Sequence, residues 1–217
     1  MSAPLVLGFD TSAAHCGAAL FSGNDVVAAL YEDMAKGQAE RLIGMCEEVL
    51  SDAGASWSDL DALGVGIGPG NFTGIRISVA AARGLAMGLG IPAVGVPILE
   101  ALAFGTEGPV LACLDARREM AYVQGFGGAV PETVTQLAIE DLQIDDLPDG
   151  CVVIGSASQA IEARFDLPRR PAAFAPASAI ARIAAIRFGP DTPAPKPLYV
   201  RAPDAAPARD TGPVILP

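Results

Sequence analysis

Three short apolar stretches begin the chain, and their spacing predicts three β-strands. Residues 4–10, 16–21 and 26–31 are runs of strand length, and the turn-forming sequence Ser-Gly-Asn-Asp joins the second run to the third. Short apolar runs that alternate with tight turns are typical of an antiparallel meander. We therefore predict that the N-terminus forms three neighbouring strands of one sheet.

The pattern changes to a helical period over residues 36–53, with Gly54 as a typical stop signal. Its apolar side chains, three and four residues apart, are Ala39, Leu42, Ile43, Cys46, Val49, Leu50 and Ala53. Downstream, the pattern predicts a strand over 61–68, a helix over 75–89, a strand over 91–96 and a short helix near 97–104. Strands and helices that alternate in this way after a meander indicate an α/β layered fold.

The C-terminal half of the chain is less regular. Its pattern predicts a hairpin of residues 109–114 and 119–126, an acidic loop-rich stretch over 131–150 with at most one short helix, a strand over 151–155 and a helix over 176–188. Gly105–Gly108 is the expected hinge before this half. From residue 191 onward proline and alanine predominate, which predicts an extended tail that contacts the surface at residues 198–200.

The predicted helix over 75–89 is apolar or small around almost its whole circumference. Arg76 and Arg83 are its only charges, and Ala80, Gly84 and Gly88 lie four residues apart on one face. Glycine within a helix costs up to about 1 kcal/mol relative to alanine. We therefore expect this helix to be buried on several sides, by its own sheet and neighbours or by a second chain.

Composition and charge narrow the class of protein. With 217 residues, 51% hydrophobic residues and a mean hydropathy of +0.40, the chain is long and apolar enough for a sizeable core. The longest uncharged stretch is interrupted by glycine and proline and the start carries no basic leader, so we expect neither a membrane span nor a signal peptide. The four cysteines are widely separated, as in a cytoplasmic protein with reduced thiols.

The net charge of −11 argues against a protein that holds nucleic acid over its whole surface. Residues 1–163 have six Lys/Arg against 21 Asp/Glu, whereas residues 164–217 have eight against four. Two interpretations of this basic end stay open: a solvated surface, or a patch that meets a partner or RNA. In the second case, Arg169 and Arg170 are the side chains whose replacement should weaken RNA binding.

The segment GIGPGNFTGIRIS, residues 66–78, is the main candidate for binding chemistry. It contains no Gly-Lys pair and does not have the G-x-G-x-x-G spacing, so it is neither a Walker A loop nor a dinucleotide fingerprint. It is then a tight structural turn, or a weak anion site at the start of a helix. The residues that would contact a nucleotide or phosphate in the second case are Asp10, Thr11, Ser12, Gly70 and Asn71.

The sequence contains few residues that could carry out other kinds of catalysis. His15 is the only histidine, so no site with two histidine ligands can form, and no serine lies in a G-x-S-x-G motif. We therefore predict neither catalytic residues nor a metal site.

Four motifs together resemble the TsaB family: LGFDTSAAHCGAALF (7–21), ALGVGIGPGNFTGIRISVAAARGLA (62–86), LDARREMAYV (114–123) and PLYVRAPDA (197–205). The resemblance implies the actin/Hsp70/sugar-kinase-like (ASKHA) fold, with a reduced second lobe. We accordingly expect an N-terminal lobe of residues 1–105 completed by a helix near 176–189, a smaller lobe of residues 106–172, and a tail of residues 190–217.

The same resemblance, to a glycoprotease-like family, implies a non-catalytic scaffold. Such a subunit dimerises with and activates a TsaD-type enzyme, which transfers threonylcarbamoyl to the adenosine next to the tRNA anticodon. A TsaE-type ATPase would join the complex, and the chain would contact tRNA only as part of that complex. The chain alone would form a homodimer. The alternative is a small-molecule ATPase or kinase that uses Asp10 and the 68–74 loop.

In the resembling family the first two helices pair with those of the partner. The residues expected to contact it are Arg41, Leu42, Met45, Val49, Ile75, Arg76, Val79, Ala80, Arg83 and Gly84. The catalytic paralogue binds metal through two histidines four residues apart on its first helix, and Gln38 and Leu42 lie near those places here. We therefore expect no cofactor on this chain alone, with ATP, ADP and metal belonging to the partner subunits.

Overall fold

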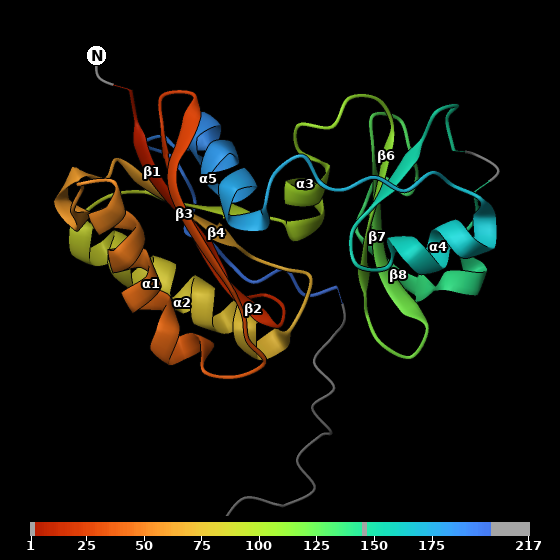
Figure 1. The fold of residues 1–217 in the computed structure, drawn as a ribbon, viewed down its shortest axis with the longest axis horizontal. Helices are drawn as coiled ribbons and strands as arrows, with labels where there is room; N and C mark the ends of the chain where they lie inside the picture. The colour runs from red at the N-terminus through yellow and green to blue at the C-terminus, as the bar shows by residue number, and fades with distance from the viewer. Residues whose placement is uncertain (1–2, 145–146, 201–217) are drawn as a thin grey trace, which may run out of the picture.

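The computed structural model describes residues 3–144 and 147–200, and these residues form two β-sheets (Figure 1). The first sheet has five strands in the order β3-β2-β1-β4-β5. Strands β1, β2 and β3 pair antiparallel, whereas β4 pairs parallel with β1 and β5 parallel with β4. The bounds are β1 Leu5–Asp10, β2 His15–Ser22, β3 Asp25–Asp33, β4 Ala62–Gly66 and β5 Ala93–Val96. The antiparallel meander predicted at the N-terminus is confirmed.

Helices cover both faces of the first sheet. Helices α1 (Gln38–Asp52) and α2 (Phe72–Leu89) lie next to each other on one face, and α5 (Pro176–Arg187) covers the other (Figure 1). The alternation of side chains along β1 separates two cores: Leu7 and Phe9 pack under α1 and α2, whereas Val6 packs on the side of α5. The 3₁₀ turn Trp57–Asp59 connects α1 to β4.

The second sheet has four strands in the order β8-β7-β6-β9. Its strands are β6 Val110–Asp115, β7 Met120–Phe126, β8 Thr135–Ala138 and β9 Val152–Ile154. Helix α3 (Ile98–Ala103) packs on one face and α4 (Ser158–Phe165) belongs to the core on the other, so that α3 lies between the two sheets (Figure 1). The predicted hairpin is confirmed, and three consecutive residues at its turn, Arg117, Arg118 and Glu119, have positive φ.

Three sequence expectations need correction. Strand β8, with the 3₁₀ turn Ile139–Asp141 after it, lies in the stretch predicted to be loop, and α4 was not predicted at all. Helix α2 begins at Phe72, three residues earlier than predicted, because the side chain of Asn71 caps it. Within its own chain α2 is buried along one side, at Gly74, Ile75, Ser78, Val79 and Ala82, so the expected burial on further sides, by a second chain, stays a prediction.

The tail is extended beyond α5, as predicted. The backbone N–H of Leu198 donates to the carbonyl of Ile67 at 2.8 Å, and the hydroxyl of Tyr199 accepts a 2.9 Å hydrogen bond from Arg76 Nε. Residues 198–200 therefore contact the surface beside the start of α2, which confirms the predicted attachment. The rest of the predicted tail, residues 201–217, lies outside the described residues.

Candidate functional site

The turn after β1 is closed by its own hydrogen bonds. The Asp10 carboxylate accepts the backbone N–H of Ser12 at 3.1 Å and its hydroxyl at 2.8 Å, and it lies 2.8 Å from His15 Nε2. Asp10 and Thr11 are fully buried, and Ser12 is 2% exposed. Because both oxygens of the Asp10 carboxylate already have partners, this side chain is a structural acceptor.

The glycine-rich loop packs directly on that turn. The Thr11 hydroxyl donates to the carbonyl of Gly74 at 2.7 Å, and the carbonyl of Ser12 accepts the N–H of Asn71 at 2.6 Å. A Cβ at Gly74 would overlap the carbonyl oxygen of Thr11, and one at Gly70 would overlap that of Ser12. Glycine is therefore required at both positions by the close approach of two backbones.

Three N–H groups in the first turn of α2 already donate to Asn71, of which that of Ile75 goes to its carbonyl. Asn71 Oδ1 accepts the N–H groups of Thr73 and Gly74, each at 3.0 Å. The five residues predicted to contact a phosphate therefore do come together, but their hydrogen bonds are made to one another and to neighbours in the same turn and loop. The phosphate-contact interpretation is corrected for Asp10, Thr11 and Ser12, since a phosphate could not reach these buried groups, and the tight-turn interpretation fits the loop.

The ten residues predicted to contact a partner divide into two groups. Five face the protein's own core under α1 and α2 and are at most 4% exposed: Leu42, Met45, Val49, Ile75 and Val79. The other five lie on the accessible side of the helices: Arg41, Arg76, Ala80, Arg83 and Gly84. The first group is a correction, because hydrophobic side chains that fill the core under a helix cannot also face a neighbour. The second group stays a prediction.

The accessible side of α2 is open, and between the charges of Arg76 and Arg83 it carries small and apolar residues. Met87 is 85% exposed, and a Cβ added at Gly84 or Gly88 would meet no atom within 4 Å. On α1, the exposed large apolar side chain is Ile43, at 38%. We call the side formed by Ile43, Ala80, Gly84, Met87 and Gly88 the outer face.

An ion network borders α1. The Arg41 guanidinium donates to the carboxylates of Glu32 on β3 and Glu48 on α1 at 2.6–3.0 Å, and these hydrogen bonds hold the pKa of both carboxyls below its usual range. The stabilising effect of these two ion pairs is therefore fully present above the usual carboxyl pKa and is lost as the pH falls through the lowered pKa values of the folded state. Arg41 is thus engaged within its own chain.

Sequence reasoning missed an aromatic cluster at the start of α2. The Arg76 guanidinium lies 3.7 Å from the ring centre of Phe72, and the ring of Tyr199 lies 5.2 Å from that of Phe72. Both rings are 41% exposed. The predicted contact of residues 198–200 with the surface was the one sequence signal for this cluster. It did not identify Phe72 as the partner of Tyr199, because the predicted helix began at residue 75 and left Phe72 in the loop.

Comparisons with known proteins agree with this arrangement. The family model described as TsaD, tRNA N6-adenosine threonylcarbamoyltransferase, matches residues 31–169. The TsaB protein of Escherichia coli, named a tRNA threonylcarbamoyladenosine biosynthesis protein, is 32% identical over 71% of this chain and 72% of its own length. The chain belongs to the TsaB family.

Two further relatives extend the match along the chain. An uncharacterized protein of Mycobacterium tuberculosis is 37% identical over 93% of this chain and 94% of its own length. The structure of YeaZ from Pseudomonas aeruginosa superposes with a TM-score of 0.71 at 27% identity, covering 90% of this chain and 99% of YeaZ. Together with more distant proteins of the same class, this likeness shows the ASKHA fold expected from the sequence.

The residues of this TsaB-family chain offer little reactive chemistry. Gln38 is turned inward, where its amide donates to the carbonyls of Ala13 and Met34, and Leu42 lies in the core. Burial raises the pKa of the Cys16 thiol to about 11 and that of Cys113 to about 12, which disfavours the reactive thiolate. Residues 3–144 and 147–200 contain no group of three or more potential metal ligands.

Within the same described ranges, no helix is both long and apolar enough to cross a membrane.

Proposed function

We propose that this chain is a non-catalytic subunit in the biosynthesis of threonylcarbamoyladenosine in tRNA, and that it binds and activates a TsaD-type catalytic subunit through the outer face. The family and the name of the E. coli relative support the pathway. A TsaE-type ATPase, tRNA reached only through the assembly, and nucleotide and metal bound by the other subunits belong to the same proposal.

The observation that carries the proposal is the open space at Gly84 and Gly88. Both residues are helical, so the chain's own fold has no need of their conformational freedom, and no atom approaches the place where a Cβ would lie. Alanine would stabilise such a helix by about 1 kcal/mol per position. Two glycines one turn apart, beside the exposed Met87, instead suit the backbone of a second helix.

The closed turn also supports a role without catalysis. An ATPase or kinase of this fold would need a place for phosphates near Asp10 and the 68–74 loop. Here the loop occupies that place itself, since Thr11 and Ser12 bind Gly74 and Asn71 directly. We therefore assign the chemistry to the partner, and the outer face would equally serve a homodimer when the partner is absent.

Co-elution tests the proposed surface. A Gly84→Glu variant places a carboxylate at the centre of the outer face, where pairing would bury it without a partner. We expect this variant to elute as a monomer when it is mixed with the TsaD-type subunit, and threonylcarbamoyl transfer by the mixture to fall to the level of that subunit alone. Light scattering after size exclusion measures the assembly.

The matched control is Gly189→Glu, because this glycine follows α5 on the other face of the sheet and also has no atom within 4 Å of a Cβ. The control variant should co-elute and activate like the unmodified chain. Co-elution of the Gly84 variant would contradict the proposed surface. ATP turnover by the purified chain alone, lost in Asp10→Ala, would contradict the non-catalytic role.

A further inference from the structure

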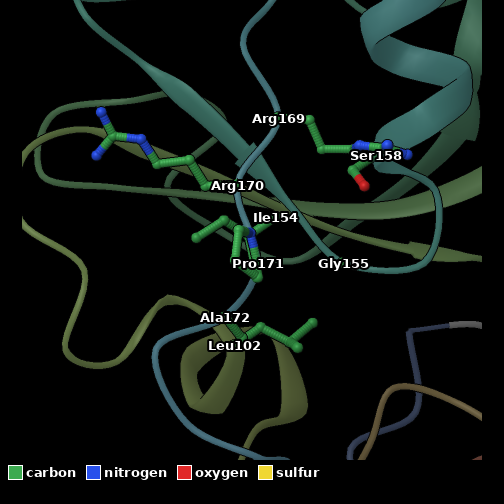
Figure 2. A pocket seen from close by; sticks show the side chains of 8 residues that line it. All are labelled: Leu102, Ile154, Gly155, Ser158, Arg169, Arg170, Pro171 and Ala172. Atoms are coloured by element: carbon green, nitrogen blue, oxygen red, sulfur yellow. The ribbon is translucent and has the colours of Figure 1, made fainter.

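A cavity of about 520 Å³ opens beside the second sheet (Figure 2), and none of the residues that line it belongs to the outer face. Its apolar wall comes from Leu102 on α3, Ile154 at the end of β9, and the segment Pro171–Ala172. Its polar wall comes from Ser158 at the start of α4 and from Arg169 and Arg170.

Ser158 points into the cavity from a buried position. The residue is 6% exposed, and its hydroxyl makes no hydrogen bond with any residue of the described part of the chain. It occupies the first turn of α4, whose cap position is Ala157 and which receives no side-chain cap. The N–H groups of Ser158 and Ile161 donate to the carbonyls of Gly155 and Ala157, which leaves those of Gln159 and Ala160 in the first turn. Free N–H groups at a helix N-terminus favour an anion, and an unpartnered hydroxyl beside them can donate to the same ligand.

The two arginines are held at the cavity by their backbone. The N–H of Val153 donates to the carbonyl of Pro168 at 2.9 Å, and the N–H of Arg170 donates to the carbonyl of Val153 at 3.0 Å. The segment is therefore pinned along the edge of β9. Figure 2 shows Arg169 extending toward Ser158, while Arg170 extends from the neighbouring position to the other side.

Neither guanidinium is firmly neutralised within the described residues. Arg169 Nε lies 3.5 Å from Glu162 Oε2, and both side chains are more than 40% exposed, a long and solvated ion pair of small energetic value. Arg170 has no acidic side chain within 4.0 Å among those residues. Positive charge thus faces the cavity although the whole chain carries −11.

We propose that this cavity binds a phosphate group, held by Ser158, Arg169 and the start of α4, with Arg170 at the rim. Guanidinium groups and helix N-termini are the donors that recognise phosphate oxygens best. The phosphate can belong to an RNA backbone or to a small phosphorylated compound, since both present the same oxygens. The inference goes beyond the proposed function and does not depend on the outer face.

Thermal stabilisation of the full-length chain by inorganic phosphate tests the site, with chloride at equal ionic strength as the reference. Because a ligand stabilises only the state that binds it, the melting temperature should rise with phosphate concentration and give a dissociation constant. Ser158→Ala and the double variant Arg169→Gln/Arg170→Gln should each weaken phosphate about tenfold or more. The control Arg117→Gln/Arg118→Gln, which removes two charges from the hairpin turn, should bind like the unmodified chain.

A variant that is expected to bind phosphate more tightly controls for the possibility that the weakened variants are merely misfolded. Glu162→Gln removes the carboxylate that competes for Arg169, so this variant should bind phosphate about twofold more tightly. If the unmodified chain, the site variants and the control all respond to phosphate equally, the proposal is overturned.

A labelled RNA with the anticodon stem-loop distinguishes the two sources, measured on the complex with the catalytic subunit. If RNA supplies the phosphate, the double variant should lower the slope of log affinity against log salt by about 0.7–0.9 for each lost contact, and the control should not. If only inorganic phosphate responds to the site variants, the ligand is a small phosphorylated compound. Both results support a phosphate site, and neither variant should change pairing with the catalytic subunit.

Discussion

The glycines at the two ends of α2 differ in what their own chain requires of them. At the N-terminal end, Gly70 and Gly74 lie so close to the carbonyls of Ser12 and Thr11 that no Cβ would fit. At the C-terminal end, Gly84 and Gly88 face open space. The first pair is explained by the fold of the single chain, and the second is not.

This difference separates a feature of stability from a feature of association. The loop glycines let β1 and α2 meet, which closes the turn around Asp10. The helix glycines lower the helix propensity without any contact within the described residues that would offset the loss. Under the proposed function, a contact with a second chain would account for their presence.

Gly74→Ala should have the largest effect on the isolated chain. The new Cβ would overlap the carbonyl oxygen of Thr11, and this oxygen can move away only if the end of β1 moves with it. The free energy of unfolding should therefore fall by about 3 kcal/mol or more. Urea denaturation measures the change. A loss below about 1 kcal/mol would show that the loop and the turn are not tightly packed. Gly74 would then not differ from Gly84 and Gly88 in the way described above.

Gly84→Ala and Gly88→Ala should have the opposite sign. The same substitution in the same helix meets no neighbour here, so each variant should gain about 1 kcal/mol in the free energy of unfolding. The measurement is again urea denaturation, at a concentration where the chain is monomeric. A loss of stability in either variant would mean that the isolated chain does need these glycines.

Much of the fold could be predicted from the hydrophobic pattern, because the pattern reports local period and burial. The meander, α1, the hairpin of β6 and β7, and the contact made by Tyr199 follow from runs of strand or helix length. Helix α4 was missed because its eight residues hold few buried apolar side chains, of which Ile161 is the main one. Strand β8 was missed because all four of its residues are only half-buried.

The site was harder to predict than the fold. The sequence places Leu42, Val49 and Val79 on the helices that pair in the family, but it does not show which side of each helix the sheet covers. The residues that fill the core are apolar for the same reason as residues at an interface, so composition cannot separate them. The phosphate-contact group failed for a related reason: the pattern predicts that Asp10 and Asn71 lie near each other, but not that both would hydrogen-bond to Ser12 between them.

Calorimetric titration of the TsaD-type subunit with the Gly84→Ala/Gly88→Ala double variant tests the central claim most directly. Two added methyl groups should hold a partner helix away from the outer face, and we predict that the affinity falls at least about tenfold although the isolated variant is more stable than the unmodified chain. An affinity equal to or greater than that of the unmodified chain would contradict the account.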